Sequence, residues 1–179
     1  MYFEIFGAWE ERGLLMFYFI YKEFTEEWYY ESDENGIVLR QIVKQEGKNS
    51  KLSNQRDSQF YMAEHPIDLA DSMLDPLQKA DFENEWVKLN ADYMSEWEQT
   101  KKENVVGQEV KAVIEVIYPQ GIIVRLNHTK YPGLASYDEF AQNAQVKNIY
   151  PDIEMIATIS GYDDSNGWIK LKNARLPIE

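Results

Sequence analysis

Histidine and cysteine, the residues that most often carry catalysis or bind metals, are scarce in this chain of 179 residues. It contains no cysteine, which excludes disulfides, thiol catalysis and cysteine-based metal sites. The two histidines, His65 and His128, lie far apart in the sequence, so no histidine cluster at ligand spacing is present. Phosphate-binding loops, dinucleotide glycine fingerprints and nucleophile elbows are also absent. We therefore expect a non-catalytic protein without a metal or cofactor.

Carboxylates are abundant, and they are distributed unevenly. The formal net charge is −13, with 22 acidic and 11 basic residues before position 104 but 9 and 7 from there onward. Neither part shows the basic stripe that phosphate backbones require. Acidity on this scale favours solubility or a basic partner, and it does not identify a general acid or base.

The composition is that of a folded cytoplasmic protein. Hydrophobic residues make up 44% of the chain and aromatic residues 14%, which is too much for a disordered segment. The first residues include Glu4 and lack the basic stretch of a signal peptide. The longest apolar run, Leu14–Tyr21, is too short to cross a bilayer as a helix, so we expect no membrane contact.

Residues 1–103 are expected to form an α+β domain, an antiparallel sheet covered by amphipathic helices. Five segments have strand patterns: Tyr2–Trp9, Leu14–Tyr21, Glu27–Glu31, Gly36–Lys44 and Gln59–Ala63. The turn Asp33–Gly36 predicts a β-hairpin, because its Asn-Gly pair tolerates positive φ at both central positions. The polar stretch Gln45–Ser58 is expected to be a loop.

Helices are expected in the second half of this domain. Pro66–Leu74 predicts a short helix, and Asp75–Gln78 then supplies an N-cap, a first-turn proline and a capping-box glutamine. Apolar residues recur at helical spacing at Phe82, Trp86, Leu89, Tyr93 and Trp97. We expect one helix to about Lys102 with this face on the sheet, the alternative being a groove-binding or dimerising helix. The charged segment Thr100–Asn104 marks the expected domain boundary.

Residues 104–179 read as five short strands, two of which follow glycines. The segments are Gly107–Ile117, Gly121–Leu126, Pro132–Ser136, Tyr150–Tyr162 and Trp168–Lys172. Their order resembles the S1 domain, an OB-fold barrel best known from RNA-binding proteins. The resemblance implies an all-β S1-like OB-fold domain that contacts RNA or single-stranded nucleic acid.

The S1 family places its RNA site on the second and third strands, where bases stack on aromatic rings. Here the matching positions hold Gln120, Ile123 and Ser136 instead of rings or an imidazole, so the resemblance implies a degenerate site. Tyrosines nearby would stack bases, and basic side chains would meet phosphates. The candidate residues are Tyr118, Ile123, Arg125, His128, Lys130, Ser136 and Tyr137. The alternative is that these side chains fill the barrel rim.

A protein-binding function is the rival hypothesis. Asp81–Trp86, together with Arg40–Ile42, is similar to small bacterial domains found beside polymorphic toxins, which look like immunity proteins. That similarity implies an acidic protein that masks a basic toxin or nuclease. A mixed acidic and aromatic cluster offers the contact candidates Glu26, Glu27, Trp28, Tyr29 and Tyr30. An ordinary half-buried strand would show the same pattern.

The segment Asp163–Gly167 superficially resembles a calcium loop. It lacks the downstream glutamate that such loops require, and its Asn-Gly pair predicts a hairpin turn instead. Lys170 and Lys172 alternate with apolar residues and are expected on the solvent face of the last strand.

Overall fold

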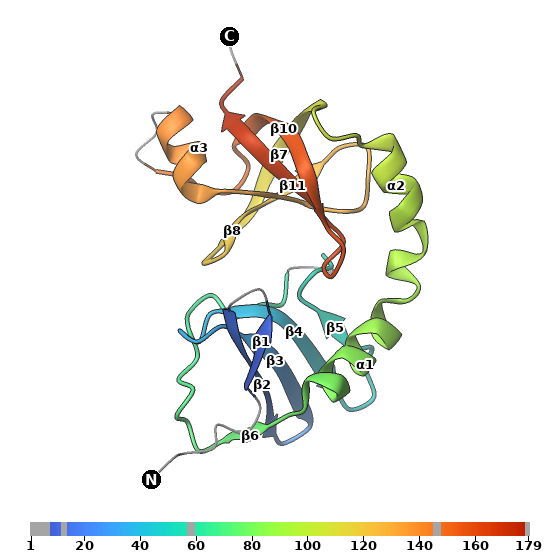
Figure 1. Cartoon of the computed structure of the whole chain (residues 1–179), viewed down its shortest axis with the longest axis vertical. Helices are drawn as coiled ribbons and strands as arrows, with labels where there is room; N and C mark the ends of the chain where they lie inside the picture. The colour runs from blue at the N-terminus through green and yellow to red at the C-terminus, as the bar shows by residue number, and fades with distance from the viewer. Residues whose placement is uncertain (1–7, 12–13, 57–59, 145–147, 178–179) are drawn as a thin grey trace. The chain divides into compact units, whose positions relative to one another are not determined.

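The computed structural model describes residues 8–11, 14–56, 60–144 and 148–177. The chain divides into two compact units, Met1–Tyr93 and Met94–Glu179 (Figure 1). This division falls before the boundary expected at residue 103, because helix α2 (Trp97–Glu103) belongs to the second unit. No helix among the described residues is long and apolar enough to cross a membrane.

The first unit is built on an antiparallel sheet, as the sequence predicted. Its strands, in spatial order, are β1 (Ala8–Glu11), β2 (Leu14–Glu23), β3 (Glu26–Ser32), β4 (Val38–Gln45) and β5 (Lys51–Leu52). A further short strand, β6 (Leu74–Pro76), pairs with β2. The predicted hairpin joins β3 to β4, where Gly36 has a φ of 78°. In the predicted strand Tyr2–Trp9, residues 2–7 lie outside the described residues.

The segment between β4 and β6 differs from the prediction. The expected loop contains β5, which pairs with β4 and buries Leu52. Phe60–Ala63 is not a strand, and position 59 lies outside the described residues. Met62 is buried there, and the backbone N–H of Ala63 donates to the side chain of Gln41 at 2.9 Å. The side chain of Gln41 thus supplies the acceptor that a neighbouring strand would supply in a sheet.

No helix forms at Pro66–Leu74. The side chains of Asp68 and Asp71 instead accept hydrogen bonds from backbone N–H groups two residues ahead, which stabilises consecutive turns. Asp75–Gln78 does not begin a helix, because Asp75 and the following proline pair with β2. Helix α1 (Lys79–Asn90) begins later, with Gln78 at its N-cap.

Helix α1 covers one face of the sheet and closes the core of the first unit. Phe82 and Trp86 are buried, as the periodicity predicted, and their rings lie 6.0 Å apart. The ring of Tyr18 from β2 lies 5.5 Å from Phe82. The buried side chains of this core are Met16, Tyr18, Ile42, Leu52, Phe82 and Trp86.

A buried ion network fixes α1 to the sheet. Arg40 on β4 is 5% exposed and hydrogen-bonds the carboxylates of Glu31 on β3 and Glu83 on α1. Its guanidinium also lies over the rings of Phe82 and Trp86, at 5.1 and 5.3 Å. One cation therefore links two strands and the helix in a nearly dry environment.

The predicted single helix to Lys102 is wrong, because α1 ends at Asn90. The amide oxygen of Asn90 accepts hydrogen bonds from Asn54 and Gln55, which hold this helix end to the loop after β5. A 3-10 helix, η1 (Tyr93–Glu96), and then α2 follow. The apolar repeat therefore serves two cores: its first members pack on the sheet and Trp97 packs in the second unit.

The second unit contains a closed five-stranded barrel, which confirms the OB-like fold. Its strands are β7 (Glu109–Tyr118), β8 (Gly121–Leu126), β9 (Gly133–Ala135), β10 (Glu154–Asp163) and β11 (Trp168–Arg175). They close in the order β7-β8-β9-β11-β10, with β9 and β11 parallel (Figure 1). Helix α3 (Tyr137–Ala144) lies between β9 and β10 in the sequence.

Two turns of the barrel follow from their residue types. Gly121 has a φ of 143°, and a Cβ there would lie 2.6 Å from the carbonyl oxygen of Ala135, so only glycine fits. The segment resembling a calcium loop is the β10–β11 hairpin turn, as predicted. The carboxylate of Asp163 accepts hydrogen bonds from the backbone of Ser165 and Asn166.

Alkaline pH should destabilise the first unit through Tyr30 on β3. Burial raises the pKa of Tyr30 from its ordinary value of 10.0 to about 12. A raised folded-state pKa contributes stability that is present below the unfolded pKa and is lost as the pH rises through about 12. Chemical denaturation at pH values across this interval should show a smaller alkaline loss for Tyr30→Phe. Equal losses in both proteins would contradict the prediction.

Candidate binding surfaces

An aromatic cluster lies where α2 meets two loops of the barrel. Trp97 of α2 is 3% exposed, and its ring lies 4.9 Å from that of Tyr131 and 6.0 Å from that of Tyr162. Tyr131 lies in the β8–β9 loop, and Tyr162 lies near the end of β10. Because Trp97 and Tyr131 are buried, these two rings are core packing and are not an open stacking platform.

Asp164, at the tip of the β10–β11 turn, holds α2 in place. Its carboxylate accepts hydrogen bonds from Lys101 Nζ and from the indole N–H of Trp97, each at 2.8 Å. The hydrogen bonds from Lys101 and then Trp97 lower the pKa of Asp164 below its ordinary value. The positive charge of Lys101 is therefore paired with a carboxylate of the second unit.

The C-terminal end of α2 is anchored to the barrel by Asn104. Its side chain is buried and donates to the carbonyl oxygen of Thr100 at 2.9 Å. The hydroxyl of Tyr162 donates to the backbone oxygen of Asn104 at 2.7 Å, and Nε2 of His128 hydrogen-bonds the Asn104 side chain. His128 thus contacts the residue that ends the helix.

The seven residues predicted to contact nucleic acid do not form one surface. Tyr118 and Ile123 are 5% and 0% exposed, so neither presents a side chain to a ligand.

The remaining five residues lie at opposite ends of the β8–β9 pair. Arg125, His128 and Lys130 are exposed at the end of β8 and in the loop that follows. Ser136 and Tyr137 follow the strand end that pairs with the beginning of β8. The loop group is the larger exposed set and contains both predicted phosphate contacts, Arg125 and Lys130.

Each predicted phosphate contact has a carboxylate partner. Arg125 Nε lies 3.3 Å from Glu115, and the guanidinium also donates to Asn127 at 3.1 Å. Lys130 Nζ lies 3.1 Å from Glu96, whose side chain is 70% exposed. An exposed pair of this kind is screened by salt and contributes little, so a phosphate can displace Glu96 from Lys130.

Ser136 has a structural role at the start of α3. Its hydroxyl oxygen accepts a hydrogen bond from the backbone N–H of Glu139 at 3.2 Å, as an N-cap does. The adjacent Tyr137 is 41% exposed. Of the two predicted contacts at this end, Tyr137 is the one that offers a ring to solvent.

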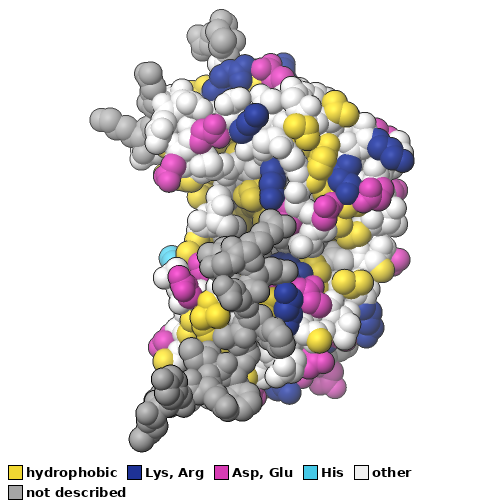
Figure 2. Space-filling view, in the orientation of Figure 1, with side chains coloured by type: hydrophobic (Ala, Val, Ile, Leu, Met, Phe, Trp, Pro, Cys, Tyr) yellow, Lys and Arg dark blue, Asp and Glu magenta, His cyan; other side chains and the backbone are white. Residues whose placement is uncertain are grey.

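Three lysines lie on another face of the barrel. Lys170 and Lys172 are exposed on β11 and alternate with buried residues, as predicted, and Lys111 is exposed on β7. Among the described residues, none of the three forms an ion pair. On the face shown in Figure 2, basic and acidic side chains are interspersed, and the coloured side chains form no large patch of one sign.

The five protein-interaction candidates on β3 are divided between the two faces of the sheet. Glu27 and Tyr29 lie on the face of α1, where the Tyr29 hydroxyl donates to Glu27 at 2.8 Å. Glu26, Trp28 and Tyr30 point to the other face, because side chains alternate along a strand. All five are half-buried, so the ordinary-strand alternative describes most of this cluster.

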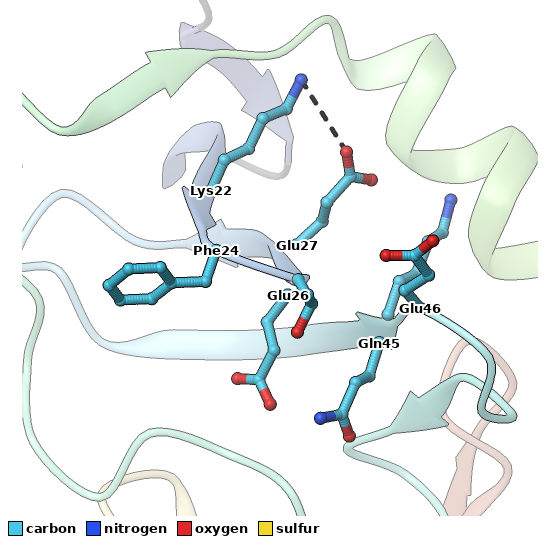
Figure 3. Close-up of a pocket in the computed structure, with 8 residues that line it drawn as sticks. Lys22, Phe24, Glu26, Glu27, Gln45 and Glu46 are labelled. Atoms are coloured by element: carbon cyan, nitrogen blue, oxygen red, sulfur yellow. Dashed lines mark ion pairs between the residues drawn. The ribbon is translucent and has the colours of Figure 1, made fainter.

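The exposed aromatic residue of this region is Phe24, which was not among the candidates. It lies at the tip of the β2–β3 hairpin and is 100% exposed. A pocket of about 370 Å³ beside it is lined by Lys22, Phe24, Thr25, Glu26, Glu27, Lys44, Gln45 and Glu46 (Figure 3). The sequence signal was a single aromatic residue within Lys22–Glu27, where no glycine or proline marks the turn.

Among the residues that the structure describes, no group of three or more His, Asp or Glu side chains is arranged to hold a metal ion.

No protein-family model matches the sequence, and no curated protein matches it. Among solved structures, the chain is similar to the apo form of Mycoplasma genitalium RNase R, with 16% identity and a TM-score of 0.38. That similarity covers 54% of this chain and 17% of the RNase R chain.

Proposed function

We propose that this is a non-catalytic binding protein whose OB-like barrel contacts single-stranded nucleic acid at the β8–β9 loop. The observation that carries the proposal is the exposed group Arg125, His128 and Lys130 at one end of a closed OB-like barrel. In OB folds, oligonucleotides usually bind the face of the second and third strands, together with the loops that join strands one to two and four to five. The β8–β9 loop adjoins that face, because β8 and β9 are the second and third strands. A family relationship to S1 domains is part of the proposal.

The chemistry at this loop is phosphate binding with little base recognition. Lys130 would meet a phosphate after displacing Glu96, Arg125 would use the exposed part of its guanidinium, and His128 would add a ring nitrogen. The ring of Tyr118, which was predicted to stack a base, is buried, and so is the ring of Tyr131 in the β8–β9 loop. We therefore infer weak, salt-sensitive and sequence-tolerant binding.

Fluorescence anisotropy of a labelled single-stranded RNA, titrated with the full chain at several salt concentrations, tests this function. Lys130→Gln should weaken binding and reduce the salt slope by about 0.7, the value for one phosphate contact on a single strand. Glu96→Gln removes the competing carboxylate and should strengthen binding by up to about fivefold, because exposed pairs contribute at most about 1 kcal/mol.

Lys88→Gln is the matched control, because Lys88 is an exposed lysine of the first unit. This variant should bind RNA as the wild type does. Absence of binding at low salt would refute the function. Equal affinities for the wild type, Lys130→Gln and Glu96→Gln would refute the site.

A second candidate function is binding of a basic protein by the first unit, as the immunity-like hypothesis implies. The specific observation is that Phe24 projects from a unit with 19 acidic and 9 basic residues in Met1–Tyr93. Charge of this sign steers basic partners and repels nucleic acid. The two candidate functions use different units, so both can hold.

A further inference from the structure

Phe24 occupies a position that is unfavourable for the free protein. It is the first residue of a two-residue loop, since Glu23 and Glu26 pair across the hairpin. Its φ is 49°, a left-handed conformation for which glycine is preferred at such a hairpin position. Its side chain is 100% exposed, and in Figure 3 the ring points away from the other labelled side chains. The turn therefore gains nothing from a phenylalanine.

The Phe24 ring makes no packing contact that would stabilise the fold. Among the described residues, no aromatic ring or cation packs on it. The other exposed large apolar side chains are less exposed, at most 66% for Val87 on α1, whereas Phe24 is 100% exposed at the tip of a turn. Aromatic side chains are enriched in the cores of protein interfaces, because they bury a large area and lose few rotamers.

The surroundings of Phe24 are acidic. Glu23 and Glu26 flank the loop, and Glu46 is held beside it by a 3.0 Å hydrogen bond from its backbone N–H to the carbonyl oxygen of Thr25. Glu26 and Glu46 have no ion-pair partner among the described residues. A complementary surface would place cations around an apolar pocket.

Two lysines at this end of the sheet are paired with other carboxylates of the unit. Lys22 Nζ lies 3.9 Å from Glu27, on the same strand pair (Figure 3). Lys44 Nζ lies 2.7 Å from Glu85 on α1 and 4.4 Å from the centre of the Tyr29 ring. A third, Lys48, is exposed and lines a pocket with Glu26, but Glu23, Glu26 and Glu46 outnumber it near the tip.

We propose that Phe24 is the anchor by which the first unit docks into an apolar pocket on a basic partner protein. Glu23, Glu26 and Glu46 would face lysines and arginines at the rim of that pocket. The inference rests on the second function proposed above and names its contact surface. It also explains why an aromatic residue stands where the backbone favours glycine.

Photo-crosslinking followed by titration tests the anchor. p-Benzoylphenylalanine is placed at position 24 of the full chain in the cells that produce it, and at Val87 as the exposed control. The protein captured from position 24 is then purified and titrated with the wild type, Phe24→Ala and Val87→Ala. We expect Phe24→Ala to weaken binding by at least about 30-fold, as loss of an interface hot spot does. Val87→Ala should bind as the wild type does.

A charge variant tests the acidic residues around Phe24. Thermal unfolding checks that weaker binding does not come from loss of the fold. The double variant Glu26→Gln/Glu46→Gln should bind more weakly and show a smaller salt dependence. Phe24→Ala should unfold at a temperature no lower than the wild type, because the ring packs on nothing. A captured protein that binds Phe24→Ala as tightly as the wild type overturns the anchor but leaves basic-protein binding standing. Absence of any captured protein at position 24, or capture of an acidic one, overturns both.

Discussion

Arg40→Met is expected to lower the free energy of unfolding of the first unit by about 3–5 kcal/mol, because it leaves the buried carboxylate of Glu31 without its cation. Glu31 is 4% exposed and takes hydrogen bonds from Arg40 and from the hydroxyl of Tyr18, the latter at 2.8 Å. Removal of the guanidinium also deletes its contacts with Phe82 and Trp86. Urea denaturation followed by tryptophan fluorescence measures the change.

A second variant separates this mechanism from a simple loss of packing. The double variant Arg40→Met/Glu31→Gln removes the charge that Arg40→Met leaves buried, so it should recover part of the loss at neutral pH. A double variant that is no more stable than Arg40→Met would contradict the prediction.

Trp97→Ala is expected to destabilise the second unit by about 3–5 kcal/mol, the usual cost of deleting a buried aromatic side chain. The indole is 3% exposed, packs against two tyrosines and donates to Asp164. Trp97→Phe keeps most of the apolar contact and loses the hydrogen bond, so it should cost about 1 kcal/mol. Val106→Ala, at a position that is 58% exposed in the same unit, is the neutral control.

The same packing has a consequence for fragments of the chain. Residues 94–179 include α2, whereas a fragment beginning at residue 104 lacks Trp97 and the partners of Asp164. We expect the longer fragment to unfold at the higher temperature in a thermal melt. Equal stabilities of the two fragments, or a Trp97→Ala variant as stable as the wild type, would show that α2 is dispensable for the barrel.

The local elements of both units could be predicted from the sequence. The Asn-Gly pairs indicated the β3–β4 and β10–β11 hairpins, although only the glycine of each pair has a positive φ and the predicted positive φ of the asparagine is wrong. Apolar alternation and glycine-led strands indicated the barrel, and the register confirms it. These signals depend on neighbours within a few residues, so the chain carries them before it folds.

The long apolar repeat from Phe82 to Trp97 shows where this reasoning fails. Its period is helical, but periodicity cannot tell which core a side chain joins, and the repeat is divided between two units. The missed strand β6 has the same cause: pairing with β2 outweighs the helix-start signals at Asp75 and Pro76. Tertiary partners that are distant in sequence decided both cases.

The candidate surfaces depended even more on the tertiary structure. The sequence identified Arg125 and Lys130 as cations near the expected site, but only the fold shows that Glu115 and Glu96 lie against them. The sequence also grouped Glu26–Tyr30 as one cluster. In the structure these side chains alternate along β3, a central strand, and therefore lie on two faces of the sheet. Local turns and strand patterns can thus be predicted from the sequence alone. Burial and charge pairing arise from contacts between distant segments, so only the folded chain decides which side chains remain available to a ligand.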